Sequence, residues 1–286
     1  MQEFGNDRVY EKISKYITEI SGIVISPEKY YLIETKLSNL MLNSGMSSFD
    51  EFYEKVLSIR SPDIAQKVIN AITVNETLWF RDAVLWKFFD RELLPKFIKM
   101  LISGKKSKIK IWSAAASTGQ EAYSIAMCID NHLKRNKISG VKLSDFEIIA
   151  TDISDRVLEI AKNGRYDKIS MTRGINDHYK AAYFKEVNAA WDLDPSIINS
   201  VNFRRFNLID SYSDFGKLDV IFYRYVLIYF PDALKKELVS KIHEALTEGG
   251  ILFTGNYVLY NFLGDIFTAE SYENLTYYSK GVVLEK

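Results

Sequence analysis

A run of small side chains at positions 113–119 and an acid at position 152 are the residues best suited to hold a ligand. The run lies inside IWSAAASTGQEAYSIAM, and Asp152 follows an apolar segment in ATDIS. Small residues after a strand let the main chain approach a ligand, and Gly119 can adopt a positive φ. A carboxylate at the end of the second strand can accept hydrogen bonds from ribose hydroxyls. The alternatives without a ligand are a tightly packed turn and a helix-capping aspartate.

The sequence lacks two common phosphate-binding motifs, GxGxxG and GxxxxGK[ST]. A site for NAD or ATP is therefore weakly supported. S-adenosylmethionine (AdoMet) carries no phosphate on its adenosine and needs no phosphate cradle. The small-residue loop and Asp152 together favour this cofactor, whose product after methyl transfer is S-adenosylhomocysteine.

Apolar spacing divides the chain into a helical part and an alternating part. Residues 1–75 show helical repeats that predict a small bundle. After residue 76, strand and helix patterns alternate, which predicts an α/β fold with a doubly wound, mainly parallel sheet. The expected strands lie at 108–112, 146–151, 218–222 and 250–253, and the expected helices at 121–133, 155–162 and 232–246.

Two segments depart from this alternation. Residues 271–284 are rich in Tyr and Val and favour antiparallel edge strands. Residues 185–200 fit neither a full helix nor a clean core strand. They form either a small inserted subdomain or a long loop.

Composition excludes several classes of function. The 286 residues contain 37 Lys+Arg and 37 Asp+Glu, so no global basic field points to nucleic acid. Cys128 is the single cysteine, and the three histidines show no metal-ligand spacing, so we expect no disulfide and no metal site. The first residues do not resemble a signal peptide, and no apolar run is long enough to insert in a membrane. We expect a cytoplasmic monomer.

Five ordered motifs resemble those of CheR-type chemotaxis receptor methyltransferases. VNETLWFRD (74–82) is similar to the TNxTxFFR signature, and IWSAAASTGQEAYSIAM to the first cofactor motif. ATDIS, FNLID (206–210) and FYRYVLIYF (222–230) are similar to three later motifs. The resemblance covers residues 13 to 281 and implies AdoMet-dependent methylation of glutamate side chains on chemoreceptors. It also implies a helical domain at 1–75 and a Rossmann-like methyltransferase domain at 76–286 with a β-subdomain at about 185–205.

The resemblance also implies roles for single residues. Arg81 and Tyr229 are expected at the reacting groups. The expected cofactor contacts are Asn75, Thr77, Arg81, Gly119, Glu121, Asp152, Asn207, Leu208, Arg224 and Tyr225. A glutamate substrate is ionised near neutral pH and needs no general base, so the enzyme would act by positioning and desolvation.

Departures from the family pattern affect the first cofactor motif and the strand-end motif. Gln120 and Ala122 replace the usual Glu and Pro and are tolerable at a helix start. Tyr225 replaces the usual Asn, which removes a compact donor and acceptor pair. Its ring would stack on adenine, shield the site or crowd the pocket.

The expected partner is the cytoplasmic domain of a methyl-accepting chemoreceptor. The second helix carries only Lys29 and Lys36 where the family has several arginines, which weakens the expected electrostatic steering. The inserted region lacks a glycine-rich turn, so we expect no use of a C-terminal tethering peptide. The alternatives are a cofactor-binding regulatory homologue with little turnover, and a methyltransferase that acts on another protein or a small acid.

Overall fold

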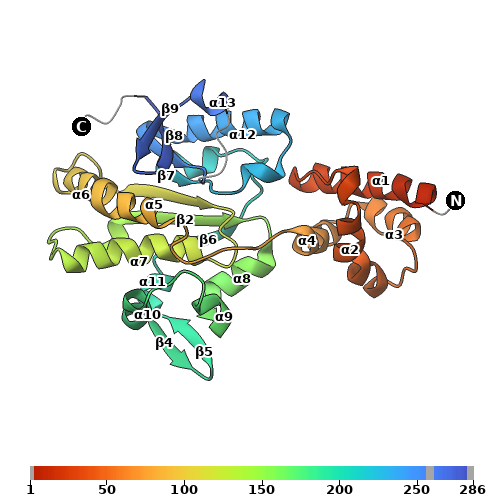
Figure 1. Ribbon diagram of the computed structural model, residues 1–286, viewed down its shortest axis with the longest axis horizontal. Coiled ribbons are helices and arrows are strands. Elements are labelled where there is room, and N and C mark those ends of the chain that lie inside the picture. The colour runs from red at the N-terminus through yellow and green to blue at the C-terminus, as the bar shows by residue number, and fades with distance from the viewer. Residues whose placement is uncertain (1–2, 256–260, 282–286) are drawn as a thin grey trace.

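The computed structural model describes residues 3–255 and 261–281 and joins a helical segment to an α/β segment (Figure 1). The Ser48 hydroxyl caps the third helix by accepting from the Glu51 N–H (3.2 Å). The helices of the first segment are α1 (Glu3–Ser21), α2 (Tyr31–Asn43), α3 (Phe49–Lys55) and α4 (Pro62–Ile72), with 3₁₀ turns at Pro27–Lys29 and Leu57–Ile59. Residues 73–82 then form a linker without helix or strand.

The α/β segment is built on a seven-stranded sheet in the order β6-β2-β1-β7-β8-β10-β9. The first five of these strands run parallel, and β10 and β9 are antiparallel, which confirms the predicted fold class. The edge strands predicted at 271–284 are found, although residues 282–284 lie outside the described part. The strands are β1 (Ile109–Ala114), β2 (Phe146–Asp152), β6 (Val201–Arg205), β7 (Leu218–Phe222), β8 (Leu246–Phe253), β9 (Thr268–Tyr272) and β10 (Leu275–Ser279).

Helices cover both faces of this sheet. Alternate residues of β1 belong to different cores: Ile111 packs in the cluster of α7, while Trp112 packs in that of α12. One face carries α5 (Ala83–Phe88), a π-helical turn (Phe89–Leu93), α6 (Leu94–Ile102), α7 (Gln120–Arg135) and α8 (Asp155–Asn163). The other face carries α12 (Asp232–Ala245), with 3₁₀ turns at Ser213–Phe215 and Leu227–Tyr229. The short helix α13 (Asn261–Gly264) precedes β9.

The chain reverses its direction of travel across the sheet at β1. From β1 it proceeds to β2 and β6 on one side and then crosses to β7 on the other. In open α/β sheets, ligands bind at such a switch point, outside the carboxyl ends of the strands. This edge also faces the helical segment (Figure 1).

A second, three-stranded antiparallel sheet projects from the α/β segment (Figure 1). Its strands are β3 (Arg165–Tyr166), β4 (Phe184–Val187) and β5 (Ala190–Leu193), and nearby helices are α9 (Lys168–Met171), α10 (Asp177–Tyr183) and α11 (Pro195–Ile198). The sheet therefore lies earlier in the chain than the expected 185–205, because residues 201–205 form β6 of the main sheet. Short, half-exposed strands such as β4 leave little periodic signal in a sequence.

Polar contacts join the helical segment to the α/β segment. Asn70 of α4 donates to Asp155 (2.7 Å) and accepts from the Ser154 hydroxyl (2.8 Å). At the end of α1, an added Cβ at Gly22 would lie 2.8 Å from Ile209. Both α4 and the end of α1 thus pack closely against the α/β segment. Across 3–255 and 261–281, no helix has the length and apolar character needed to cross a membrane.

Candidate cofactor site

A cavity of about 560 Å³ lies at the switch point, between the sheet and the helical segment. Its volume falls within the range of roughly 300–1,000 Å³ usual for small-molecule sites. The linker residues 73–78 and Arg81 line it, together with residues that follow β1, β2, β6 and β7. The cavity contains every predicted site residue except Gly119.

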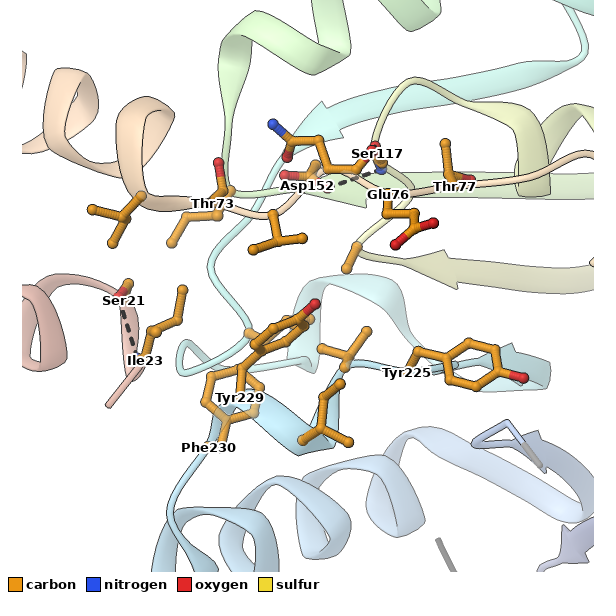
Figure 2. A pocket seen from close by; sticks show the side chains of 18 of the residues that line it. Ser21, Ile23, Thr73, Glu76, Thr77, Ser117, Asp152, Tyr225, Tyr229 and Phe230 are labelled. Atoms are coloured by element: carbon orange, nitrogen blue, oxygen red, sulfur yellow. Dashed lines mark hydrogen bonds between the residues drawn. The ribbon is translucent and has the colours of Figure 1, made fainter. Parts of the chain in front are cut away.

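Asp152 ends β2 and is held by two backbone donors, of which Figure 2 shows Ser117. The N–H of Ser117 donates to Oδ2 (2.9 Å), and the N–H of Ser154 donates to Oδ1 (2.9 Å). Burial raises the pKa of the Asp152 carboxyl, and these hydrogen bonds partly offset that rise. Each oxygen keeps lone pairs for a further donor. The carboxylate is therefore fixed in place with acceptor capacity to spare.

The small-residue loop takes an unusual backbone path beside Asp152. Ala115 and Ser117 both have φ of +53°. Left-handed backbone at residues other than glycine is uncommon and gathers at functional sites. The turn aims the Ser117 N–H at Asp152, and the Ser117 hydroxyl donates to the Asn75 carbonyl of the linker (3.0 Å). The loop thus joins the end of β1, the acid of β2 and the linker.

Arg224 follows β7 and is almost completely buried among acceptors. Its guanidinium donates to Glu121 (2.6 Å), to Asp82 (2.6 Å) and to the Arg81 carbonyl (2.8 Å). Burial alone would lower the pKa of Arg224, but the carboxylates of Glu121 and Asp82 outweigh it and the pKa is raised. The Ser113 hydroxyl donates to the other oxygen of Glu121 (2.7 Å). Arg224 therefore acts as a structural cation that holds two acids at the cavity wall.

Arg81 contrasts with Arg224. Its guanidinium carbon lies 3.6 Å from the centre of the Tyr225 ring. Among the described residues its side chain has no hydrogen-bond or ion-pair partner. The Tyr225 hydroxyl donates to Asp82 (2.6 Å). Figure 2 shows the Tyr225 ring extending away from Tyr229 and not between Tyr229 and Asp152.

The linker is fixed by Trp79, whose side chain is fully buried. The indole N–H donates to the Ser170 carbonyl (3.1 Å), and the Trp79 N–H donates to the Arg173 carbonyl (3.1 Å). A Cβ added at Gly174, which has φ of +96°, would lie 2.1 Å from the Trp79 carbonyl oxygen. Only glycine permits this close approach. The segment around α9 therefore holds the linker against the cavity.

Tyr229 lies at the mouth of the cavity, on the 3₁₀ turn after β7, and is 36% exposed. Burial and the nearby Glu76 raise the pKa of its hydroxyl, and Arg81 lowers it less. The hydroxyl therefore remains a donor at neutral pH. Of the eleven exposed large hydrophobic residues in the described chain, five line this cavity: Val24, Tyr31, Val74, Ile228 and Tyr229. The mouth is therefore an apolar surface.

Three predicted residues also make packing or hydrogen-bond contacts outside the cavity. The Asn207 amide donates to the Ile20 carbonyl at the end of α1 (2.9 Å), so this amide N–H₂ joins the two segments. Leu208 lines the cavity and also packs in the apolar cluster of α12. Gly119 has the expected positive φ (+93°), but its Cβ position faces Ala161 and two rings at 3.0–3.1 Å, so the residue serves packing outside the cavity.

Several residues of the site were given no individual role by sequence reasoning. Asp82, Ser113 and Ser117 each hold another polar group of the wall. Glu76 lines the cavity, points into it in Figure 2, and pairs with Arg173 (2.7 Å). All four lie inside quoted motifs, so position within a motif was the available signal. The sequence did not show which polar groups pair with one another, because most of the partners lie far apart in the chain.

Comparison with known proteins adds an independent observation. A family model described as the CheR methyltransferase SAM-binding domain matches residues 75–259, and one for the all-alpha domain matches residues 8–73. Chemotaxis protein methyltransferase Cher2 of Pseudomonas putida is 35% identical over 257 residues, which cover 90% of this chain and 92% of the relative. Chemotaxis protein methyltransferase 1 of Pseudomonas aeruginosa is 37% identical with the same coverage. A Vibrio parahaemolyticus chemotaxis protein methyltransferase is 35% identical, covering 87% of this chain and 88% of the relative.

Proposed function

The chain belongs to the CheR methyltransferase family of AdoMet-dependent enzymes, and on that premise we propose that it methylates glutamate side chains of chemoreceptors. The observation that carries the cofactor side of this proposal is the Asp152 carboxylate. It is buried, held by two backbone donors, and lines a cavity at the switch point of the sheet. A ribose diol supplies the two further donors that such a carboxylate can accept.

The remaining cavity wall suits the other parts of AdoMet. Phe206, Leu208 and Ile153 give an apolar surface for adenine beside Asp152. Glu121 accepts from Ser113 and Arg224 and can accept further from an ammonium group. Arg81 offers an unoccupied guanidinium to a carboxylate. These residues would bind and orient the cofactor.

AdoMet, when bound, supplies an electrophilic methyl group on a sulfonium. A substrate carboxylate oxygen would accept this methyl group, and the electron pair of the C–S bond would stay on sulfur. No proton is transferred, so the protein's residues act by alignment and by exclusion of water. Tyr229 lies at the mouth, where its protonated hydroxyl can donate to the incoming carboxylate.

The receptor would dock on the apolar mouth of the cavity. Val24, Tyr31 and Ile228 are 45%, 62% and 52% exposed there, and Lys29 and Lys36 supply positive charge beside them. We propose that docking needs no tethering peptide. The β4–β5 hairpin supports this, because it closes with the tight turn Asn188-Ala189, where both residues have positive φ, and carries no glycine.

The test is transfer of labelled methyl groups from AdoMet to a receptor cytoplasmic fragment, measured as base-labile volatile radioactivity. We expect incorporation, and none into the same fragment with its candidate glutamates replaced by alanine. Binding of S-adenosylhomocysteine in calorimetry without any methyl transfer would instead indicate a regulatory cofactor-binding protein. Label on both fragments would indicate a different acceptor. Micromolar binding of a receptor C-terminal peptide would contradict the absence of a tether.

A further inference from the structure

We propose that Tyr225 is a positioning residue for Arg81, whose N–H edge it presents to the carboxylate of the methionine part of AdoMet. The inference rests on the proposed function, because it requires AdoMet in the cavity. Tyr225 stands where the family motif usually has asparagine. Its role is therefore a property of this chain that the usual family motif does not predict.

The Tyr225 ring is held on several sides. Its hydroxyl donates to Asp82 (2.6 Å), and its backbone N–H donates to the Thr254 carbonyl (3.1 Å). A Cβ at Gly255, which has φ of +91°, would lie 3.0 Å from two atoms of the ring. The glycine thus leaves room for the ring, and the ring has little freedom to move.

The backbone at Tyr225 has φ of +58°, in the left-handed region. Asparagine tolerates that region, whereas a bulky aromatic residue there is a strained outlier. The chain therefore keeps an aromatic side chain at a cost to the local backbone. Such strain points to a use for the ring.

The use that the geometry offers is a platform for Arg81. The guanidinium carbon lies 3.6 Å from the ring centroid, well inside the roughly 6 Å limit of a cation–π contact. With the guanidinium over the ring, its N–H groups remain available to a ligand. None of those groups has a hydrogen-bond or ion-pair partner among the described residues. A flat guanidinium with a free edge is suited to bidentate binding of a carboxylate.

The neighbours of Arg81 identify which carboxylate this is. Arg224 donates to the Arg81 carbonyl and also to Glu121, so Arg81 and Glu121 lie at the same end of the cavity. Both side chains line the cavity, so they offer it a cation and an anion. The amino-acid end of AdoMet carries the matching pair, a carboxylate and an ammonium group. The face of Tyr225 that Arg81 covers is not available for stacking on adenine.

The experiment compares two ligands that share a nucleoside and sulfur. S-adenosylhomocysteine has the amino-acid end, and 5′-methylthioadenosine lacks it. We expect Tyr225→Leu to weaken S-adenosylhomocysteine about tenfold in calorimetry while 5′-methylthioadenosine changes by less than about twofold. Arg81→Met is expected to give the same selective loss. The double variant is expected to bind S-adenosylhomocysteine within about twofold of Arg81→Met, because the two residues act as a unit.

Tyr225→Phe is the conservative control, because it keeps the ring and removes the hydroxyl that donates to Asp82. We expect it to retain S-adenosylhomocysteine affinity within about threefold. Equal losses of both ligands in Tyr225→Leu, no loss, or additive losses in the double variant would overturn the inference. Should Tyr225→Leu fail to fold, Arg81→Lys carries the test, because lysine keeps the charge without the planar stack. Selective loss there supports the inference, and unchanged affinity overturns it. Wild-type protein that binds neither ligand would instead contradict the proposed cofactor site.

Discussion

The two walls of the cavity differ in how their polar groups are satisfied. On the sheet side, the Arg224 side chain is 2% exposed and that of Glu121 13%, and both acids bound to Arg224 are held within 2.6 Å. On the helical side, Lys29, Tyr31 and Lys36 are exposed, and among the described residues neither lysine has an ion-pair partner. One wall is fixed before any ligand arrives, and the other is open to contact.

This difference matches two kinds of recognition. A small cofactor of constant shape is bound best by preorganised groups, whose order costs nothing at the moment of binding. A protein partner is met over an apolar area with a few charges that affect encounter more than affinity. Changes in the sheet wall should therefore affect folding and cofactor binding, and changes in the helical wall should affect only the protein substrate.

The largest expected effect follows from removing the cation of the sheet wall. Arg224→Met leaves Glu121 and Asp82 buried without their partner, so we expect the free energy of unfolding to fall by about 3–5 kcal/mol. Urea denaturation with an unchanged m-value measures it. Lys36→Met, the matched control on the helical wall, should change it by less than about 0.5 kcal/mol. Equal effects of the two substitutions would contradict the contrast between the walls.

Features set by neighbouring residues could be predicted from the sequence, whereas contacts between residues far apart in the chain could not. Local periodicity and ordered motifs predicted the sheet, the helical segment and the place of Asp152. The Arg224 pair with Glu121 spans 103 positions and leaves no local signal. The second use of Asn207, as a bond to α1, needs the packing of the two segments. The small antiparallel sheet was placed too late, because β3 has only two residues and β4 alternates weakly.

Cofactor binding should depend on pH through Asp152. Burial raises the pKa of Asp152 in the free protein, and ribose donors would favour the ionised form. Affinity for S-adenosylhomocysteine should therefore be complete above that raised pKa and fall as the pH drops through it. Asp152→Asn should weaken S-adenosylhomocysteine about 10–100-fold at neutral pH. Its affinity should no longer fall as the pH drops through the raised pKa. Calorimetry across pH measures both, and Asp177→Asn, an exposed aspartate outside the cavity, should keep the wild-type profile.

The raised pKa of Asp152 affects folding stability in the opposite direction to cofactor affinity. Between the ordinary aspartate pKa and the raised one, the folded state binds more protons than the unfolded state. The stability contributed by Asp152 therefore falls as the pH rises through that window. The unfolding free energy of the wild type, relative to that of Asp152→Asn, should therefore fall as the pH rises through this window. A difference that is constant with pH would mean that the carboxyl is not desolvated.

A smaller effect is expected where the walls are joined. Asn207→Ala removes the amide that donates to the Ile20 carbonyl, so we expect a loss of about 1 kcal/mol in unfolding free energy. Hydrogen exchange should show increased opening at the end of α1 with the sheet strands unchanged. Asn202→Ala, at an exposed position of β6, is the control. Loss of protection throughout β1 and β2 would show that the bond supports the sheet as well as the join between segments.

The smallest effect is expected on the helical wall, from Lys29→Ala combined with Lys36→Ala. Both side chains are exposed and line the mouth, so their charge acts mainly on the encounter with an acidic partner. We expect kcat/KM for a receptor fragment to fall about three- to fivefold at low salt, and the difference to shrink as salt approaches 1 M, where the Debye length is about 3 Å. S-adenosylhomocysteine affinity should stay within about twofold, because no cofactor contact is assigned to this wall. A matched loss of cofactor affinity would mean that the two walls bind one ligand together, and the division of labour between them would be wrong.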